Sequence, residues 1–311
     1  MVGAGAVGSF YGAMLARAGH RVTLIGREAH MQAIATDGLH LDLADSPSIE
    51  NIALRTSTNI AVVSDADLIL FCVKSTDSLT SAQSMAPHLQ PNAVLISLQN
   101  GVENIALITQ HVKNTVIPAV VYVASELTAP GYVKHHGGGD LVIGAMSSAS
   151  MNHHVQTLTQ IANLFASAKV DVRISDNVIR ELWFKLMINC AFNAISGLSQ
   201  LPYGELLQCE PIRSTQTAVV KEVIAVAKAE GVDLSESEAL QTIANISAAM
   251  PNQKSSTAQD MARKRLSEID HLNGFVVRRG AQHGIPTPSN QVLFAMVKLM
   301  ESSYARGTHL N

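Results

Sequence analysis

The stretch that decides the fold is Met1-Val-Gly-Ala-Gly-Ala-Val-Gly-Ser-Phe10. It contains the pattern G-x-G-x-x-G, in which the first glycine permits a tight turn, the second lets the backbone approach a pyrophosphate, and the third lets a helix pack close to a sheet. The helix that follows such a loop directs its amide donors at the phosphates. Glycine clusters also make ordinary turns, but this one opens a helix and lies about 20 residues before the end of a strand, as a dinucleotide fold requires. We therefore predict a dinucleotide-binding loop made of Gly3, Ala4, Gly5, Ala6, Val7 and Gly8.

Around this loop, short β-rich runs alternate with helical patterns, which predicts a parallel, doubly wound sheet. The expected parallel strands are Arg21–Ile25, Leu68–Val73 and Ala93–Ser97, and the expected helices include Ser9–Ala18 and Ser78–Leu89. A non-parallel extension is expected from Val116–Ala124, Gly131–His135 and Leu141–Ile143, with a turn at Gly137-Gly-Gly139 and a last strand at Val170–Ile174.

The character of the chain changes after Asp176, because nearly every later window is helical. We therefore predict an α/β protein with a Rossmann-type, dinucleotide-binding domain at 1–175 and an all-α domain at 176–311. Ser175 or Asp176 is the expected cap of the first helix. Only Met1 and Val2 precede the glycine loop, whereas a first strand usually has about five or six residues. We expect either a native start upstream or a first strand that is only a stub.

The composition excludes several classes of protein. The 22 Lys and Arg residues against 25 Asp and Glu give a net charge of −3, without the basic face that nucleic-acid binding needs. No apolar run approaches the ~20 residues of a membrane span, and no signal-peptide pattern is present. The three distant cysteines indicate reduced core residues of a cytoplasmic protein, with no metal site. Charged residues make up only 15%, which favours burial within the chain or against a second subunit, such as in a homodimer.

Residues at the ends of three predicted strands indicate which cofactor binds and where it lies. Arg27 follows the second predicted strand of the nucleotide fold, where an NAD enzyme usually has an acidic residue, and a guanidinium can pair with a 2′-phosphate. Arg27 therefore favours NADP, although the neighbouring Glu28 keeps NAD open. Lys74 and Asn100 also end strands, at the edge where ligands bind in such sheets. A solvated lysine and a turn asparagine are the alternatives for these two.

A polar stripe follows one face of an otherwise apolar helical segment, Glu181–Ile195. Lys185, Asn189 and Asn193 recur every four residues, and Ser196 continues the same arc. Buried amides need partners, which a ligand would supply, whereas the alternative is an ordinary solvent face. Further along, Ser256 is either a ligand contact or the start of a capping box with Gln259, and Glu268 is either a site residue or a surface carboxylate.

Together these motifs resemble the ketopantoate reductase (2-dehydropantoate 2-reductase) family over nearly the whole chain. The resemblance rests on Gly3–Gly8, Val73-Lys-Ser75, Gln99-Asn-Gly101, the run Arg180–Asn193 with its W-x-K-x-x-x-N-x-x-x-N pattern, Ser255-Ser256, Glu268-Ile-Asp270 and Asn273-Gly274. It implies that NADPH reduces the ketone of 2-dehydropantoate to (R)-pantoate, a step toward pantothenate and coenzyme A.

The resemblance also implies residue roles. Lys185 would be the general acid that protonates the developing alkoxide, and Glu268 would orient it. Asn100 would touch both the cofactor and Lys185, and Lys74 would lie near the cofactor ribose. The remaining implied contacts are the glycine loop and Arg27 for NADPH, and Asn189, Asn193 and Ser256 for the substrate.

The chemistry is coherent, because hydride transfer creates an oxyanion that an ammonium can both stabilise and protonate. Since the cofactor and acid groups come from different domains, we expect the site in the cleft between them. Two alternatives stay open: a related reductase of another small 2-keto or 3-hydroxy acid, and an NADPH-binding sensor without turnover.

Overall fold

The structure of the protein is a computed structural model, which describes residues 1–304, except for the side chains of residues 148, 149 and 151–153. The chain divides into two compact units, Met1–Glu181 and Leu182–Asn311. The division falls inside a helix, a few residues after the predicted boundary at Asp176. The last seven residues of the predicted helical domain, 305–311, lie outside the described residues.

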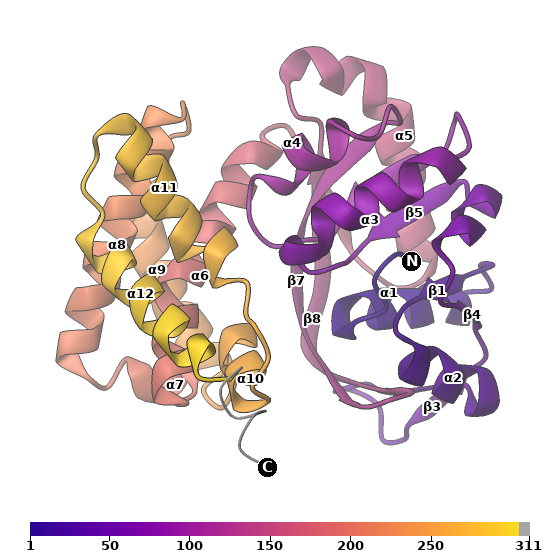
Figure 1. Ribbon diagram of the computed structural model, residues 1–311, viewed down its shortest axis with the longest axis horizontal. Coiled ribbons are helices and arrows are strands. Elements are labelled where there is room, and N and C mark those ends of the chain that lie inside the picture. The colour runs from indigo at the N-terminus through magenta and orange to yellow at the C-terminus, as the bar shows by residue number, and fades with distance from the viewer. Residues whose placement is uncertain (305–311) are drawn as a thin grey trace. The chain divides into compact units, whose positions relative to one another are not determined.

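A parallel sheet lies at the centre of the first unit (Figure 1). Strand β5 (Leu68–Phe71) pairs with β6 (Val94–Ser97), and β6 pairs with the start of β7 (Val116–Ala129). Strand β1 (Thr23–Ile25) pairs with β4 (Arg55–Ser57). Val2 forms parallel bridges with both Ile25 and Phe71, so this one residue takes the place of a first strand between β1 and β5.

The non-parallel extension is a long hairpin of β7 and β8 (Tyr132–Gly144). Strands β2 (Leu39–Asp42) and β9 (Val172–Ser175) run parallel to β8, and β3 (Glu50–Ile52) lies antiparallel to β2. The turn expected at Gly137-Gly-Gly139 is wrong, because β8 continues through these glycines and the chain turns before Tyr132 instead. The glycines accommodate irregular pairing: Gly138 has φ 72°, and a Cβ there would lie 2.2 Å from the carbonyl oxygen of Tyr122.

Helices cover both faces of this sheet, which confirms the doubly wound α/β fold. One hydrophobic cluster joins the sheet to the first and last helices of the unit, and a second cluster joins it to α3 and α4. The helices are α1 (Ala6–Arg17), α2 (Glu28–Asp37), α3 (Ser78–Met85), α4 (Asn104–Thr109) and α5 (Ser148–Ser167), with short 3-10 turns η1 (Ile60–Asp65), η2 (Ser75–Asp77) and η3 (Ala86–His88).

The second unit is helical throughout its described residues, as predicted. Its elements are α6 (Val178–Ser199), α7 (Tyr203–Leu206), α8 (Glu210–Ala229), α9 (Glu236–Ala249), α10 (Ser256–Ala262), η4 (Ile269–His271), α11 (Asn273–His283) and α12 (Pro288–Ser302). The expected cap of α6 is wrong by one or two residues. The side chain of Asn177 accepts the backbone N–H of Arg180 at 3.1 Å, while Ser175 accepts the N–H of Asn177.

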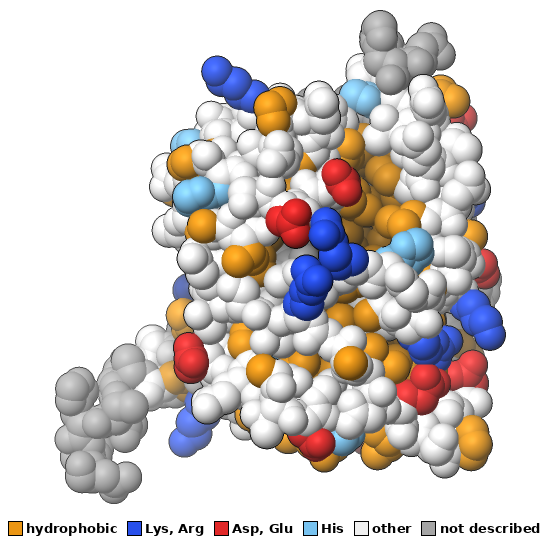
Figure 2. All heavy atoms as spheres, turned by 90° about the vertical axis from the view of Figure 1, so that its right-hand side faces the viewer, with side chains coloured by type: hydrophobic (Ala, Val, Ile, Leu, Met, Phe, Trp, Pro, Cys, Tyr) orange, Lys and Arg blue, Asp and Glu red, His pale blue; other side chains and the backbone are white. Residues whose placement is uncertain are grey.

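Membrane spans, metal sites and the cysteines can be examined in the described part of the chain. No described helix is long and apolar enough to cross a membrane. No group of three or more potential metal ligands occurs among the described residues. All three cysteines are unpaired, but Cys209 is exposed, so the expectation of a core position is wrong for it. The face drawn in Figure 2 is mostly uncharged, with basic side chains interspersed among acidic ones.

Candidate functional site

The glycine loop has the geometry of a phosphate cradle. A Cβ on Gly3 would lie 2.5 Å from the backbone nitrogen of Val73, and one on Gly8 would lie 2.3 Å from the carbonyl oxygen of Gly3. Both positions therefore require glycine for close packing. Gly5 differs, because a Cβ there would meet nothing within 4 Å, and no side chain caps the helix that begins after it. The first amides of α1 are thus left for an anion, so these residues fit a dinucleotide.

Arg27 lies just past the end of β1 and forms the N-cap residue of α2. It is exposed, and its guanidinium makes no hydrogen bond or ion pair within the described residues. Glu28 follows in the first turn of the helix and is exposed as well. A basic group therefore stands where the nucleotide fold presents its ribose-recognising side chain.

A buried polar network joins the loops after β5 and β6. The side-chain amide of Gln99 donates to the carbonyl oxygen of Val73 at 2.9 Å and to the hydroxyl of Ser78 at 2.6 Å. The carbonyl oxygen of Asn100 accepts from Ser75 Oγ at 3.1 Å and from the side chain of Asn104 at 2.7 Å. Because Val73 also abuts the glycine loop, this network brings Lys74 and Asn100 to the same edge of the sheet as that loop.

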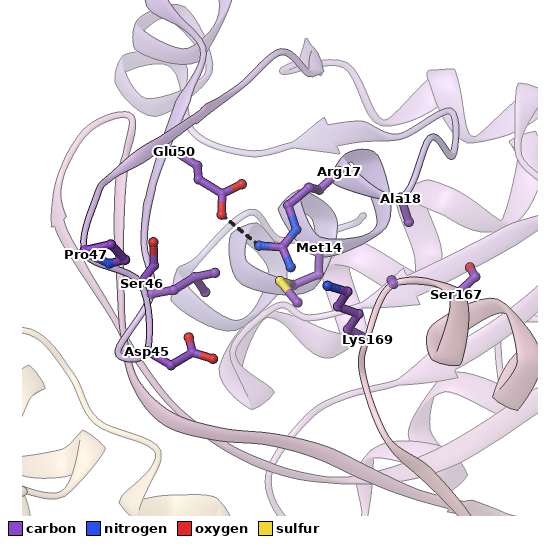
Figure 3. A pocket seen from close by; sticks show the side chains of 11 residues that line it. Met14, Arg17, Ala18, Asp45, Ser46, Pro47, Glu50, Ser167 and Lys169 are labelled. Atoms are coloured by element: carbon purple, nitrogen blue, oxygen red, sulfur yellow. Dashed lines mark hydrogen bonds and ion pairs between the residues drawn. The ribbon is translucent and has the colours of Figure 1, made fainter.

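The first unit also contains a cavity of about 520 Å³ at the other end of α1 (Figure 3). Its charged lining is balanced: Arg17 pairs with Glu50 at 3.0 Å, and Asp45 and Lys169 supply one further charge of each sign. The cavity lies at the C-terminal end of α1, whereas the glycine loop precedes its N-terminal end. It is therefore separate from the cofactor loop.

In the second unit, α6 is buried on nearly all sides, and Lys185 and Asn189 are the only residues between Leu182 and Gly197 that are not buried. Lys185 and Asn189 are half-buried and Asn193 is buried, while their neighbours along the helix are buried apolar residues. The side-chain amides of Asn189 and Asn193 make no hydrogen bond within the described residues. Ser196 differs, because its hydroxyl donates to the carbonyl oxygen of Leu201 at 2.9 Å and serves the fold.

Lys185 and Glu268 form an electrostatic pair, although 83 positions separate them in the sequence. Burial lowers the pKa of Lys185 to about 8, while the negative charge of Glu268 raises it and limits the shift. Glu268 is half-buried just before η4. An ammonium whose pKa lies near neutrality is suited to donate a proton, because it is charged at neutral pH yet gives up the proton readily.

The two serines at the start of α10 have different roles. Ser255 is the N-cap: it is buried, and its hydroxyl accepts the backbone N–H of Ala258 at 3.0 Å. The alternative in which Ser256 caps the helix is therefore wrong. Ser256 is the first helical residue and is exposed, so its hydroxyl is not consumed by the fold in this way.

Sequence reasoning missed His30, which links three segments around the nucleotide loop. Its Nδ1 accepts the backbone N–H of Gly131 at 2.9 Å, so Nε2 carries the hydrogen and donates to Ser9 Oγ at 3.0 Å. Burial lowers the pKa of His30, which favours this neutral form. The available signal was Ser9, a polar residue directly after the glycine motif on a buried helix.

The comparisons with protein-family models match both units. The family described as "Ketopantoate reductase PanE/ApbA" matches residues 1–148, and "Ketopantoate reductase PanE/ApbA C terminal" matches residues 177–301. A 2-dehydropantoate 2-reductase of Halobacterium salinarum is 31% identical over 301 residues, which cover 96% of this chain and 97% of that relative.

Solved structures show the same likeness. A PanE/ApbA family ketopantoate reductase from Ralstonia eutropha has a TM-score of 0.89 and 47% identity, covering 98% of each chain. D-mandelate dehydrogenase in a ternary structure with NADH and anilino(oxo)acetate has a TM-score of 0.91 over 98% of each chain. At 24% identity, this second likeness concerns the fold alone.

Proposed function

The chain belongs to the ketopantoate reductase family and is an oxidoreductase of the 2-dehydropantoate 2-reductase type, and on that premise we propose that it reduces 2-dehydropantoate with NADPH and that Lys185 supplies the proton. The product is (R)-pantoate, on the route to pantothenate and coenzyme A. The first unit binds the cofactor in this proposal, and the second unit carries the acid and the substrate contacts.

The proposal of NADPH rests on Arg27. Its exposed guanidinium makes no hydrogen bond or ion pair within the described part of the chain, so it can pair with the 2′-phosphate that distinguishes NADPH from NADH. The glycine loop holds the pyrophosphate through backbone amides, and Lys74 and Asn100 contact the cofactor from the loops after β5 and β6. When bound, the cofactor supplies the hydride.

The acid step follows from the charge of the product oxygen. As the ketone accepts a hydride, negative charge develops on its oxygen, and the Lys185 ammonium both stabilises that charge and donates its proton from Nζ. Glu268 keeps Lys185 protonated by raising its pKa. Asn189 and Asn193 offer side-chain amides that have no hydrogen-bond partner among residues 1–304 as described, and Ser256 offers a hydroxyl for the substrate carboxylate.

The Lys185–Glu268 pair is the observation that carries this proposal, and steady-state kinetics test it. The purified protein should oxidise NADPH in the presence of ketopantoate with a higher kcat/KM than with other 2-keto acids. A preference for an aryl or a shorter keto acid would point to a related reductase, and binding of NADPH without turnover of any keto acid would point to a sensor.

We also propose that the enzyme is a cytoplasmic homodimer joined through α12. Val292, Met296 and Leu299 are spaced by four and three residues, so they share a face, and they are 62%, 45% and 62% exposed. The only charged residues of α12, Lys298 and Glu301, are engaged within the unit. This face therefore presents no like charges to a second copy, and an apolar face of this kind is typical of a protein interface.

Leu299→Glu should therefore convert a dimer into a monomer in size-exclusion chromatography with light scattering. Val155→Glu is the matched control, because Val155 is an exposed apolar residue on α5. A monomeric wild-type protein would contradict the proposed dimer. The three unpaired cysteines support the cytoplasm as the compartment.

A further inference from the structure

Helix α12 contacts the segment that carries Glu268 through a buried carboxylate. Glu301 Oε1 accepts the backbone N–H of Ser267 at 2.8 Å and the hydroxyl of Ser267 at 2.6 Å. Glu301 is only 4% exposed and Ser267 only 1%. Burying a carboxylate is costly even when it is hydrogen-bonded. The proposed reaction has no step for Glu301, so its burial needs another explanation.

A second contact from the same helix holds the other flank of Glu268. Lys298 Nζ lies 2.8 Å from Asp270 Oδ2 and 3.4 Å from Glu301 Oε2. The hydrogen bond with Asp270 raises the pKa of Lys298, so this lysine stays protonated at neutral pH. The residue before Glu268 and the second residue after it are therefore both fixed by α12.

Between these two flanks the backbone has little freedom. The hydroxyl of Ser267 accepts the N–H of Ile269 at 3.3 Å, and the carbonyl oxygen of Glu268 accepts the N–H of His271 at 2.9 Å. Ile269 is fully buried. Since Glu268 lies between anchored residues, the location of its carboxylate depends on the two contacts with α12.

We propose that Glu301 and Lys298 are positioning residues, which hold the Ser267–Asp270 segment so that the Glu268 carboxylate stays close to the Lys185 ammonium. This inference rests on the proposed function, in which that ammonium is the acid. It gives α12, which contains none of the predicted site residues, a role in positioning the acid pair.

The decisive variants are Glu301→Ala and Glu301→Gln. Glu301→Ala removes the acceptor for Ser267, whereas Glu301→Gln keeps a side-chain oxygen in the same place. The readout is the pH dependence of Lys185 acylation by acetic anhydride, followed by mass spectrometry, because only the neutral amine reacts. We expect Glu301→Ala to lower the apparent pKa of Lys185 by roughly half to one unit, since a charge pair loses about a third of its attraction when its separation grows from about 4 to about 6 Å. Glu301→Gln should stay close to wild type.

Epistasis separates positioning from general destabilisation. In a Glu268→Gln background there is no charge left to position, so Glu301→Ala should no longer move the apparent pKa of Lys185. An equal shift in both backgrounds, or no shift in the wild-type background, would overturn the proposal.

Lys298→Met tests the other flank if Glu301→Ala fails to fold, because Lys298 is partly exposed and methionine keeps much of the apolar part of its side chain. It should shift the apparent pKa of Lys185 in the same direction. The matched control is Lys221→Met, which removes an exposed lysine that pairs with Glu236 at 3.5 Å on other helices. A Lys298→Met protein that behaves like Lys221→Met would also count against the proposal.

The acylation measurement does not depend on turnover, so the two proposals fail separately. If Lys185→Ala retains near wild-type turnover, Lys185 is not the acid, whatever Glu301 does. If Lys185→Ala is inactive and Glu301→Ala leaves the apparent pKa of Lys185 unchanged, the proposed function stands and the positioning role is wrong.

Discussion

Raising the pH through 8 should reduce the rate of keto-acid reduction, because only the ammonium form of Lys185 can donate a proton. With a pKa of about 8, Lys185 is about 90% protonated at pH 7 and about 10% protonated at pH 9. The value of kcat/KM, which reports groups of the free enzyme, should therefore fall roughly tenfold between these two pH values. The substrate carboxylate is ionised throughout this range, so it does not contribute to the decline.

Two variants identify the group behind this alkaline decline. Lys185→Ala should lose about 10²–10⁴-fold in turnover and should show no decline linked to a lysine. Glu268→Gln keeps the size of the side chain and removes the charge. Because Glu268 raises the pKa of Lys185, its removal lowers that pKa, and the decline should move to lower pH.

The assay is the loss of NADPH absorbance with ketopantoate, at saturating NADPH, in buffers of constant ionic strength. Lys221→Ala serves as the control, because Lys221 is an exposed lysine of α8 outside the proposed site. The reasoning is refuted if the decline persists in Lys185→Ala, or if Glu268→Gln moves it to higher pH.

Three further predictions concern the cofactor loop and the start of α10. Arg27→Ala should weaken NADPH binding about 10- to 150-fold in fluorescence titrations, because one charge-assisted contact of about 1.5–3 kcal/mol is lost. NADH binding should be nearly unchanged. Equal losses for both cofactors would show that Arg27 does not determine the preference for NADPH. Gly8→Ala should lower the melting temperature, because its Cβ would lie 2.3 Å from a carbonyl oxygen. Gly5→Ala should mainly weaken NADPH binding, because its Cβ would enter open space. The reverse pattern would contradict the proposed geometry of the phosphate cradle. Ser255→Ala should lower the free energy of unfolding in urea by about 1 kcal/mol, because the helix cap is lost. Ser256→Ala should leave the free energy of unfolding unchanged and raise KM for the keto acid. An unchanged KM in Ser256→Ala would exclude Ser256 from the substrate site.

Much of the fold could be predicted because its signals are local. The glycine loop, the parallel strands and the helical second half depend on short windows of sequence, and these appear in the structure. The prediction failed at Gly137-Gly-Gly139, since a glycine run has the same local signature whether it reverses the chain or relieves a clash inside a strand. Only the pairing with Tyr122, on the neighbouring strand, distinguishes the two cases.

The candidate site divides in the same way. The stripe on α6 could be predicted from a stride of four along one helix, and the structure adds that its two amides are left without partners among the described residues. The contact of Glu301 with Ser267 could not be predicted, because it joins residues 34 positions apart and neither residue belongs to a recognisable motif. Which of two adjacent serines caps α10 also depends on packing against another helix, where Ser255 Oγ meets the carbonyl oxygen of Asn193.

Strand β8 pairs with three other strands, and these pairings imply an order of events during folding. Its pairing with β7 closes across a short turn, whereas its pairings with β2 and β9 join segments that are far apart in the sequence. Closing a short loop costs less entropy than closing a long one, so the hairpin should form before either parallel neighbour docks. In pulse-labelling hydrogen exchange, amides of Val120 and Val142 should then gain protection ahead of those in β9.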